Sequence, residues 1–135
     1  LEYVTSKKLR ALYFYSSYEP SWWRKLQKRY PDVASTDDVE AVFPADCSLD
    51  LYTQVVKKQT VWPTNDLSIK TLATHLGFEW RDADPSGAES IEWYHRWVEG
   101  GDEQVKRRIL EYNEDDCRAT RVLLDALRAM PVIGG

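Results

Sequence analysis

The sequence predicts an α/β domain that is rich in helices and contains few strands. One segment, residues 9–16, is short, apolar and aromatic, as is typical of a buried strand. Most other apolar residues recur at helical spacing, between the Gly and Pro residues that end helices. The chain has 135 residues, 43% of them hydrophobic and 30% charged, which fits a single folded domain and excludes the disordered, collagen-like and coiled-coil classes.

The first half of the chain is predicted to continue with two helices and one ambiguous segment. The helix from Pro20 ends at Pro31, because Pro20 suits a first turn, Ser21 can cap it and Pro31 cannot continue it. A short helix follows Ser35, whose Ser-Thr-Asp-Asp sequence is a capping pattern. Residues 46–56 are compatible with either a strand or a helix.

The second half is predicted to be helical. Residues 67–76 carry apolar side chains at helical spacing, and Gly77 follows where a C-cap glycine belongs. Ser86 and Glu89 form a capping box for the next helix, which stops at the glycine pair 100–101. A last helix then runs from residue 102 to about residue 130.

The predicted strand needs partners, because the backbone groups of a single strand cannot satisfy one another. Either further strands lie in the ambiguous segment, or the partner strands are missing from this chain.

Charge and composition restrict the function further. The chain has 18 basic and 22 acidic residues, a net charge of −4, so it is not a protein that binds nucleic acid mainly by neutralising phosphates. An enzyme that holds metal ions on carboxylates remains compatible with this balance. The two cysteines, Cys47 and Cys117, have no zinc-binding spacing. No apolar run is long enough for a membrane span and no signal peptide is recognisable, so we expect a cytoplasmic protein.

One carboxylate of the last helix falls within its apolar stripe. With Tyr112 at zero and about 100° per residue, Asp116 lies at about +40° and Asp115 at about −60°. We therefore expect Asp116 to be buried in the middle of the stripe and Asp115 to lie near its edge. A carboxylate in an apolar setting needs a partner. Asp116 is either a structural ion-paired or capping residue or a metal or catalytic ligand, and Tyr112, one turn earlier, could orient a water molecule beside it. The stripe consists of Val105, Ile109, Tyr112, Ala119, Thr120, Leu123, Ala126, Leu127 and Met130.

An ordered set of motifs resembles a known family. Tyr112 and Asp116 match the Tyr-x-x-x-Asp motif of RNase H-like exonucleases of the DEDD type, tyrosine subclass. From about residue 9 to 128 the chain is similar to the RNase H-like domain at the C-terminus of RecB-family-like nucleases. The motifs that carry this resemblance are YFYSSYE (13–19), DLY (50–52), SIKTLATHLGF (68–78), WRD (80–82), SGAES (86–90), WY (93–94) and YNEDDC (112–117).

The resemblance implies an RNase H-like fold and a site with two divalent ions, Mg²⁺ or Mn²⁺, held on four carboxylates. By position, Glu19 supplies the carboxylate of the second motif, where most of the superfamily has Asp, and Asp116 supplies the last. Tyr112 orients the attacking water, and Asp115 is a further candidate metal ligand. Glu19 has a second interpretation as a helix N-terminal acid, and Asp50 fits better as the start of a helix.

The chain departs from this family at the first motif. The two carboxylates of an Asp-x-Glu strand are absent before residue 9, and Asp38-Val39-Glu40 and Asp82-Ala83-Asp84 match by letters only. We therefore expect this chain to be a single RNase H-like domain, residues 1–135, that lacks its N-terminal strands. As an isolated chain it should bind metal poorly and have little or no activity.

Two functions remain open at this point. The first is a metal-dependent nuclease with 3′–5′ exonuclease character, with Glu19 and Asp116 close together at the end of the strand 9–16. Lys57 and Lys58 are candidates for phosphate contacts, and Trp62 for stacking on a base. The second is a non-catalytic helical module that binds a protein partner or a second copy of itself, with Asp116 paired to an arginine such as Arg24 or Arg121. Exposed apolar surface on an incomplete domain makes a homodimer compatible with both.

Overall fold

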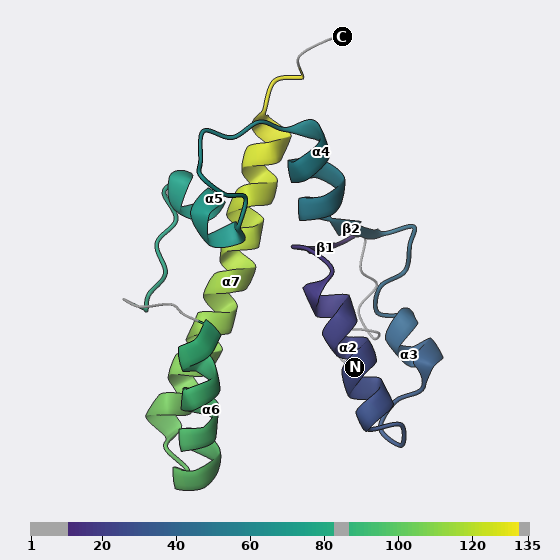
Figure 1. Ribbon diagram of the computed structural model, residues 1–135, viewed down its shortest axis with the longest axis vertical. Helices are drawn as coiled ribbons and strands as arrows, with labels where there is room; N and C mark the ends of the chain where they lie inside the picture. The colour runs from purple at the N-terminus through teal and green to yellow at the C-terminus, as the bar shows by residue number, and fades with distance from the viewer. Residues whose placement is uncertain (1–10, 83–86, 133–135) are drawn as a thin grey trace. The chain divides into compact units, whose positions relative to one another are not determined.

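In the computed structural model, residues 11–82 and 87–132 are described. The chain forms two compact units, Leu1–Leu67 and Ser68–Gly135, and each is described by itself (Figure 1).

The first unit contains a parallel pair of short strands. Strand β1 (Leu12–Phe14) pairs with β2 (Ser48–Asp50), with Leu12 opposite Ser48 and Phe14 opposite Asp50. The strand predicted at 9–16 is therefore shorter within the described residues, and it is half-buried on both faces instead of fully buried. Its predicted need for a partner is met by part of the ambiguous segment 46–56.

Helices form the connection between these parallel strands, as parallel pairing requires. Helix α2 (Tyr18–Arg29) begins two residues before Pro20, which occupies its first turn as predicted. The prediction that Ser21 caps it is wrong: Ser17 is the N-cap residue, and Ser21 is inside the helix, where its N–H donates to the Ser17 carbonyl.

The short helix after Ser35 is confirmed as α3 (Thr36–Glu40). Ser35 and Asp38 form a complete capping box, in which each side chain accepts from the other residue's backbone N–H. Arg24 of α2 makes two hydrogen bonds to the Glu40 carboxylate, of 2.6 and 2.8 Å, and this pair fixes α3 against α2.

The rest of the ambiguous segment is helical. A π-helix, η1 (Leu51–Val56), follows β2 directly and leads into α4 (Lys57–Gln59). Leu51 and Val56 are almost completely buried, and Pro20, Val39 and Val42 are the other buried apolar residues described in this unit.

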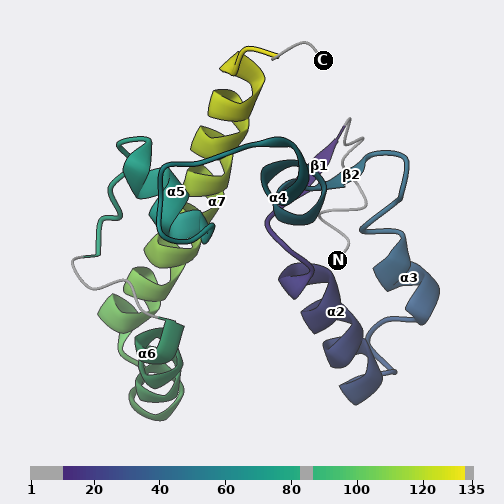
Figure 2. The ribbon, with the colours of Figure 1, turned by 45° about the horizontal axis from the view of Figure 1, so that its top comes forward.

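The second unit is built around one long helix. Figures 1 and 2 show α5 (Ile69–His75) and α6 (Gly87–Gly100) beside α7 (Glu103–Ala129), at different points along its length. The buried side chains that join α6 to α7 are Trp93, Val105 and Tyr112, with Trp80, Trp97 and Ile109 packed against them.

The predicted helix boundaries of this unit depend on local caps. Ser68 caps α5, and Gly77, at a φ of +87°, ends it in a Schellman motif in which Gly77 and Phe78 donate to the carbonyls of Thr74 and Ala73. Asp102 caps α7 as predicted, by accepting from two backbone N–H groups of the first turn. The predicted capping residue of α6, Ser86, lies outside the described residues.

Among the described residues, no helix has both the length and the apolar character required to cross a lipid bilayer.

Gly77 and Gly100 provide a matched test of the helix end that we assign to Gly77. A Cβ atom at either residue would meet no atom within 4 Å, so only backbone conformation separates them. We expect Gly77→Ala to destabilise the protein by roughly 1 kcal/mol, because it forces Ala into the left-handed region. Gly100→Ala should be neutral or slightly stabilising, because Gly100 ends a helix without a positive φ. Urea denaturation measures both, and equal effects would contradict the assignment.

Candidate functional site

Tyr112 and Asp116 lie one turn apart on α7, and their surroundings differ. Tyr112 is buried, and its ring packs edge-on against Trp93 at a centroid distance of 6.1 Å. The ammonium of Lys70, on α5, lies 5.3 Å from the centre of the Tyr112 ring. Asp116 is only half-buried.

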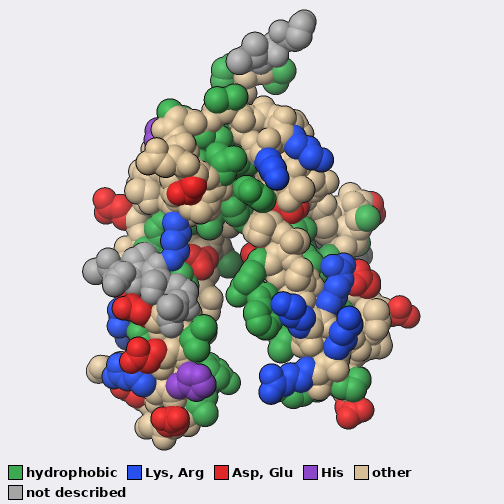
Figure 3. Space-filling view, viewed as in Figure 1, with side chains coloured by type: hydrophobic (Ala, Val, Ile, Leu, Met, Phe, Trp, Pro, Cys, Tyr) green, Lys and Arg blue, Asp and Glu red, His purple; other side chains and the backbone are tan. Residues whose placement is uncertain are grey.

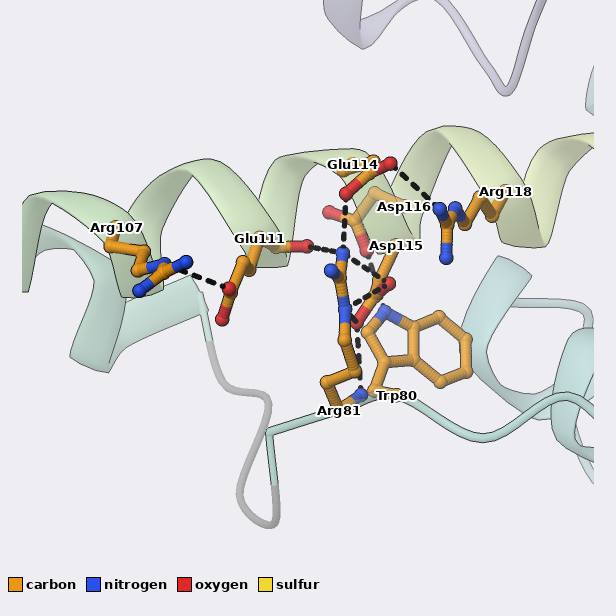
Figure 4. A network of polar contacts seen from close by, with 8 residues as sticks. All are labelled: Trp80, Arg81, Arg107, Glu111, Glu114, Asp115, Asp116 and Arg118. Carbon is orange, nitrogen blue, oxygen red and sulfur yellow. Dashed lines mark hydrogen bonds and ion pairs between the residues drawn. The ribbon is translucent and has the colours of Figure 1, made fainter.

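The indole of Trp80 holds one oxygen of Asp116. Its Nε1–H donates to Oδ1 at 3.0 Å, from the segment that precedes α6 (Figure 4). No residue in the described parts of the chain hydrogen-bonds to the second oxygen, Oδ2. Asp116 therefore has a fixed carboxylate with one oxygen open to a further ligand.

Asp115 is the buried carboxylate of this helix, with 3% of its surface exposed. The predicted order, with Asp116 buried and Asp115 near the edge, is therefore wrong. The reason is tertiary: Arg81 lies over Asp115, with Nε 2.9 Å from Oδ1 and the backbone N–H 2.9 Å from Oδ2. Asp115 lies at the edge of the apolar stripe of α7, and Arg81 covers it there.

The Arg81 guanidinium also joins neighbouring acceptors on α7. Its Nη2 donates to the Glu114 carboxylate at 2.7 Å and to the Glu111 carbonyl at 2.9 Å, and Arg118 binds the other oxygen of Glu114 at 2.8 Å (Figure 4). A planar guanidinium suits this arrangement, because its donors point at several acceptors at once.

These contacts keep both acids ionised. Burial by itself would raise the pKa of the Asp115 carboxyl, but the hydrogen bonds from the side chain and backbone of Arg81 outweigh it, and the pKa lies below its ordinary value. The Arg81 hydrogen bond and the charge of Arg118 likewise lower the pKa of Glu114.

In the first unit, Glu19 lies just beyond the carboxyl end of β1. It is exposed, in the first turn of α2. Asp50 ends the neighbouring strand and caps η1 through the Thr53 N–H, as the interpretation of Asp50 as a helix start predicts. Its Oδ1 also accepts from the backbone N–H of Ser16 at 2.9 Å.

Ser16 has a φ of +75°, which is uncommon for a residue other than glycine. The hydrogen bond from Ser16 to Asp50 stabilises this turn, which leads directly into the residues that carry Glu19. Asp50 therefore has a structural role at the edge where the two parallel strands end.

The acids that match Asp-x-Glu by letters have other partners. Asp38 caps α3 and Glu40 binds Arg24, so both carboxylates of that segment stabilise local structure. Asp82 accepts from Nη2 of Arg108 at 2.8 Å. Asp84 lies outside the described residues.

The predicted nucleic-acid contacts lie in the first unit. Lys57 and Lys58 are exposed on α4. Trp62 is half-buried, and its Nε1–H donates to the Thr60 hydroxyl at 2.8 Å. The indole of Trp62 is thus held in place, and its role in base stacking stays a prediction, as do those of the two lysines.

Comparison with known protein families assigns the chain. The family model of the RNase H superfamily matches residues 1–128, which cover the first compact unit completely and the second as far as residue 128. The chain belongs to the RNase H superfamily. Neither a curated protein nor a solved structure matches it. The predicted fold class, an RNase H-like and helix-rich α/β fold with few strands, is confirmed.

The candidate metal ligands in this RNase H-like chain are the carboxylates of Asp116 and Glu19. In the described part of the chain, no group of three or more His, Cys, Asp or Glu side chains is placed to hold one. Asp116, with an open oxygen, and Glu19, exposed at the first turn of α2, are hard oxygen donors of the type that Mg²⁺ and Mn²⁺ prefer. Each of these two carboxylates, taken by itself, has the donor chemistry of a ligand to a divalent ion.

Sequence reasoning missed the roles of Trp80 and Arg81. Both belong to the WRD segment, which the resemblance includes without a function for its members. A tryptophan and an arginine that follow a helix end carry no periodic signal, so their contacts with α7 are visible only in three dimensions. In this superfamily member they hold adjacent aspartates in different environments.

The Arg81 contacts predict how stability depends on pH. We expect Asp115→Asn to destabilise the protein at about pH 7 by on the order of 2 kcal/mol, because it removes a charged acceptor from Arg81. The folded-state pKa of Asp115 is lowered, so its contribution is complete above about pH 4, the pKa in the unfolded chain, and is lost as pH falls below it.

The measurement is thermal unfolding at about pH 7 and about pH 3, and the difference between the wild type and Asp115→Asn should be smaller at the lower pH. Asp125→Asn is the control, since Asp125 is an exposed aspartate of the same helix, paired with Arg121. An equal effect of the two substitutions at neutral pH would contradict the structural role of Asp115.

Proposed function

We propose that this RNase H superfamily chain is a metal-dependent nuclease domain that hydrolyses phosphodiester bonds of nucleic acid, with the 3′–5′ exonuclease character of the DEDD tyrosine subclass. One observation carries the proposal. Asp116 has one oxygen fixed by Trp80 and one open, and Tyr112 lies one turn before it on the same helix. A buried tyrosine one turn from a fixed carboxylate suits the orientation of a water molecule.

Glu19 and Asp116 are the metal ligands in this proposal. These carboxylates would hold a divalent ion, whose chemistry when bound would be the activation of water and the stabilisation of the leaving oxygen of a phosphodiester. Tyr112 holds the attacking water through its hydroxyl, and the packing of its ring against Trp93 limits its motion.

Trp80 is a positioning residue. Its hydrogen bond fixes the orientation of the Asp116 carboxylate before metal binds, which lowers the cost of ordering the ligand. The metal role predicted for Asp115 has less support, because Arg81 binds both of its oxygens. We propose instead that Asp115 anchors the segment that carries Trp80.

The resemblance assigns two of the four family carboxylates to this chain, Glu19 and Asp116. We therefore propose that the isolated chain is weakly active at most, and that metal binding is the more sensitive test. Whether the substrate is DNA or RNA is settled by offering both as 5′-labelled single strands.

Asp116→Asn should abolish Mn²⁺-dependent hydrolysis of a labelled single strand, a loss of more than about 100-fold, since loss of a direct ligand exceeds loss of an outer one. It should also weaken Mn²⁺ binding measured by titration calorimetry, and Glu19→Gln should act in the same direction. Asp125→Asn is the control for charge on α7. If Asp116→Asn still hydrolyses the strand, or if neither substitution changes the affinity for Mn²⁺, the proposed site is wrong.

Trp80→Phe keeps the aromatic ring and removes only the indole N–H. We expect roughly a 10-fold rise in the Mn²⁺ concentration for half-maximal activity or binding, as for other outer-sphere partners, with little change in thermal stability. Trp97→Phe, at a half-buried tryptophan of the same unit, is the matched control. Equal metal dependence in the two variants would remove Trp80 from the site.

A second candidate function is a non-catalytic interaction module. It is favoured by a cavity of about 300 Å³ in the first unit, lined by residues of α2 and the segment that follows it, among them Trp23, Leu26, Tyr30 and Val33. Among the described residues, Asp116 has no arginine partner of the kind predicted for that case: Trp80 binds it, and Arg24 and Arg121 bind Glu40 and Asp125. Concentration-dependent sedimentation that responds to Leu26→Ser, without metal-dependent hydrolysis, would favour this function.

A further inference from the structure

One face of α2 carries aromatic side chains in its first turns and basic side chains in its later turns. Tyr18, Trp22, Lys25 and Arg29 are separated by four, three and four residues, a spacing that places them on one side of the helix. All four are exposed, and the two rings keep 65% and 44% of their surface in solvent. Lys28 and Tyr30 flank this row, and the six residues together are called the α2 face here.

The side chains of the α2 face contact one another. The rings of Tyr18 and Trp22 are 5.9 Å apart, and the Lys25 ammonium lies 4.5 Å from the centre of the Trp22 ring. The Arg29 guanidinium lies 5.6 Å from the Tyr30 ring. Aromatic planes and cations are thus held beside one another over about 16 Å of helix.

The charge of this face is not neutralised locally. Helix α2 carries four basic residues, and within the described ranges only Arg24 is ion-paired, with Glu40. Lys25, Lys28 and Arg29 have no carboxylate partner among the described residues. Figure 3 shows lysine and arginine side chains gathered over α2. In a chain with a net charge of −4, a basic helix face complements an anionic partner.

We propose that the α2 face binds single-stranded nucleic acid, with bases stacked on Tyr18, Trp22 and Tyr30 and phosphates paired with Lys25, Lys28 and Arg29. Exposed rings beside cations suit an unpaired strand, because each base has a π-face that can stack on a ring and each phosphodiester carries a negative charge. A cation–π contact at an exposed site is weak, so Lys25 can leave the Trp22 ring for a phosphate while a base takes its place.

The α2 face leads to the proposed metal ligand of the same helix. Glu19 follows Tyr18 directly in the first turn. A strand lying along the face from Arg29 toward Tyr18 would therefore reach the Glu19 carboxylate. The choice of nucleic acid as the ligand rests on the proposed nuclease function. The α2 face adds a second set of nucleic-acid contacts to those predicted for Trp62, Lys57 and Lys58.

The test is fluorescence anisotropy of a short fluorescein-labelled oligothymidylate in EDTA, with the full chain carrying Asp116→Asn so that hydrolysis plays no part. The double variant Lys25→Gln/Lys28→Gln should weaken binding about tenfold and reduce the slope of log K against log salt by about 1.4, since each phosphate contact in a single strand contributes about 0.7. Arg107→Gln/Arg121→Gln removes the same charge from exposed positions of α7 and is the control.

Trp22→Leu should weaken binding by roughly tenfold with the salt slope unchanged, because it removes stacking and no charge. Tyr18→Ala repeats this test at a more exposed ring, should Trp22→Leu disturb folding. A blunt duplex of the same sequence should bind more weakly than the single strand.

Several results would overturn the inference: no binding, equal loss in the α7 control, a duplex bound as tightly as the single strand, or no effect of either aromatic substitution. Dimers that dissociate on Trp22→Leu, with no oligonucleotide binding, would assign the face to a second copy of the chain. Binding that depends on the α2 face, with Mn²⁺ binding that neither Asp116→Asn nor Glu19→Gln weakens, would refute the proposed metal site and leave this inference intact.

Discussion

The ion pair between Arg81 and the buried Asp115 is the constraint on which the site in the second unit depends. It ties the segment after α5 to the middle of α7 through the backbone and the side chain of one residue. Because Trp80 immediately precedes Arg81, fixing the arginine also fixes the indole that binds Asp116. Without this pair, the half-buried side chain of Asp116 would lose the contact that selects its rotamer.

Two adjacent aspartates can serve different purposes because successive residues on a helix point about 100° apart. Asp115 turns toward the packed segment, where a buried carboxylate is tolerable only with a charged, hydrogen-bonding partner. Asp116 turns toward a more open side and keeps one oxygen available. The two adjacent aspartates therefore have different surroundings: Asp115 is buried and ion-paired, and Asp116 keeps one oxygen for the metal ion that we propose.

Three helix caps of this fold were predicted correctly, but the N-cap of α2, which makes no side-chain hydrogen bond, and the tertiary partners were not. Ser35, Gly77 and Asp102 act through hydrogen bonds within a few residues, so their sequence patterns gave correct helix ends. Residues 46–56 were ambiguous because a three-residue strand runs directly into a π-helix, and neither has a clear period. The order of burial of Asp115 and Asp116 was predicted wrongly because it is decided by Arg81, 34 residues away in the chain.

The first unit has a corresponding division of roles at the edge where its parallel strands end. Oδ1 of Asp50 accepts hydrogen bonds from the backbone of Ser16 and Thr53, so this carboxylate shapes the turn. That turn starts α2 and presents Glu19 at its first turn, where a carboxylate is favoured by the helix dipole even without a metal. The basic residues lie in the later turns of the same helix, where the dipole favours cations. Helix α2 therefore has a carboxylate at one end and cations toward the other, for electrostatic reasons. This polarity suits the binding that we propose, with a polyanion along the helix and a divalent ion at its N-terminal end.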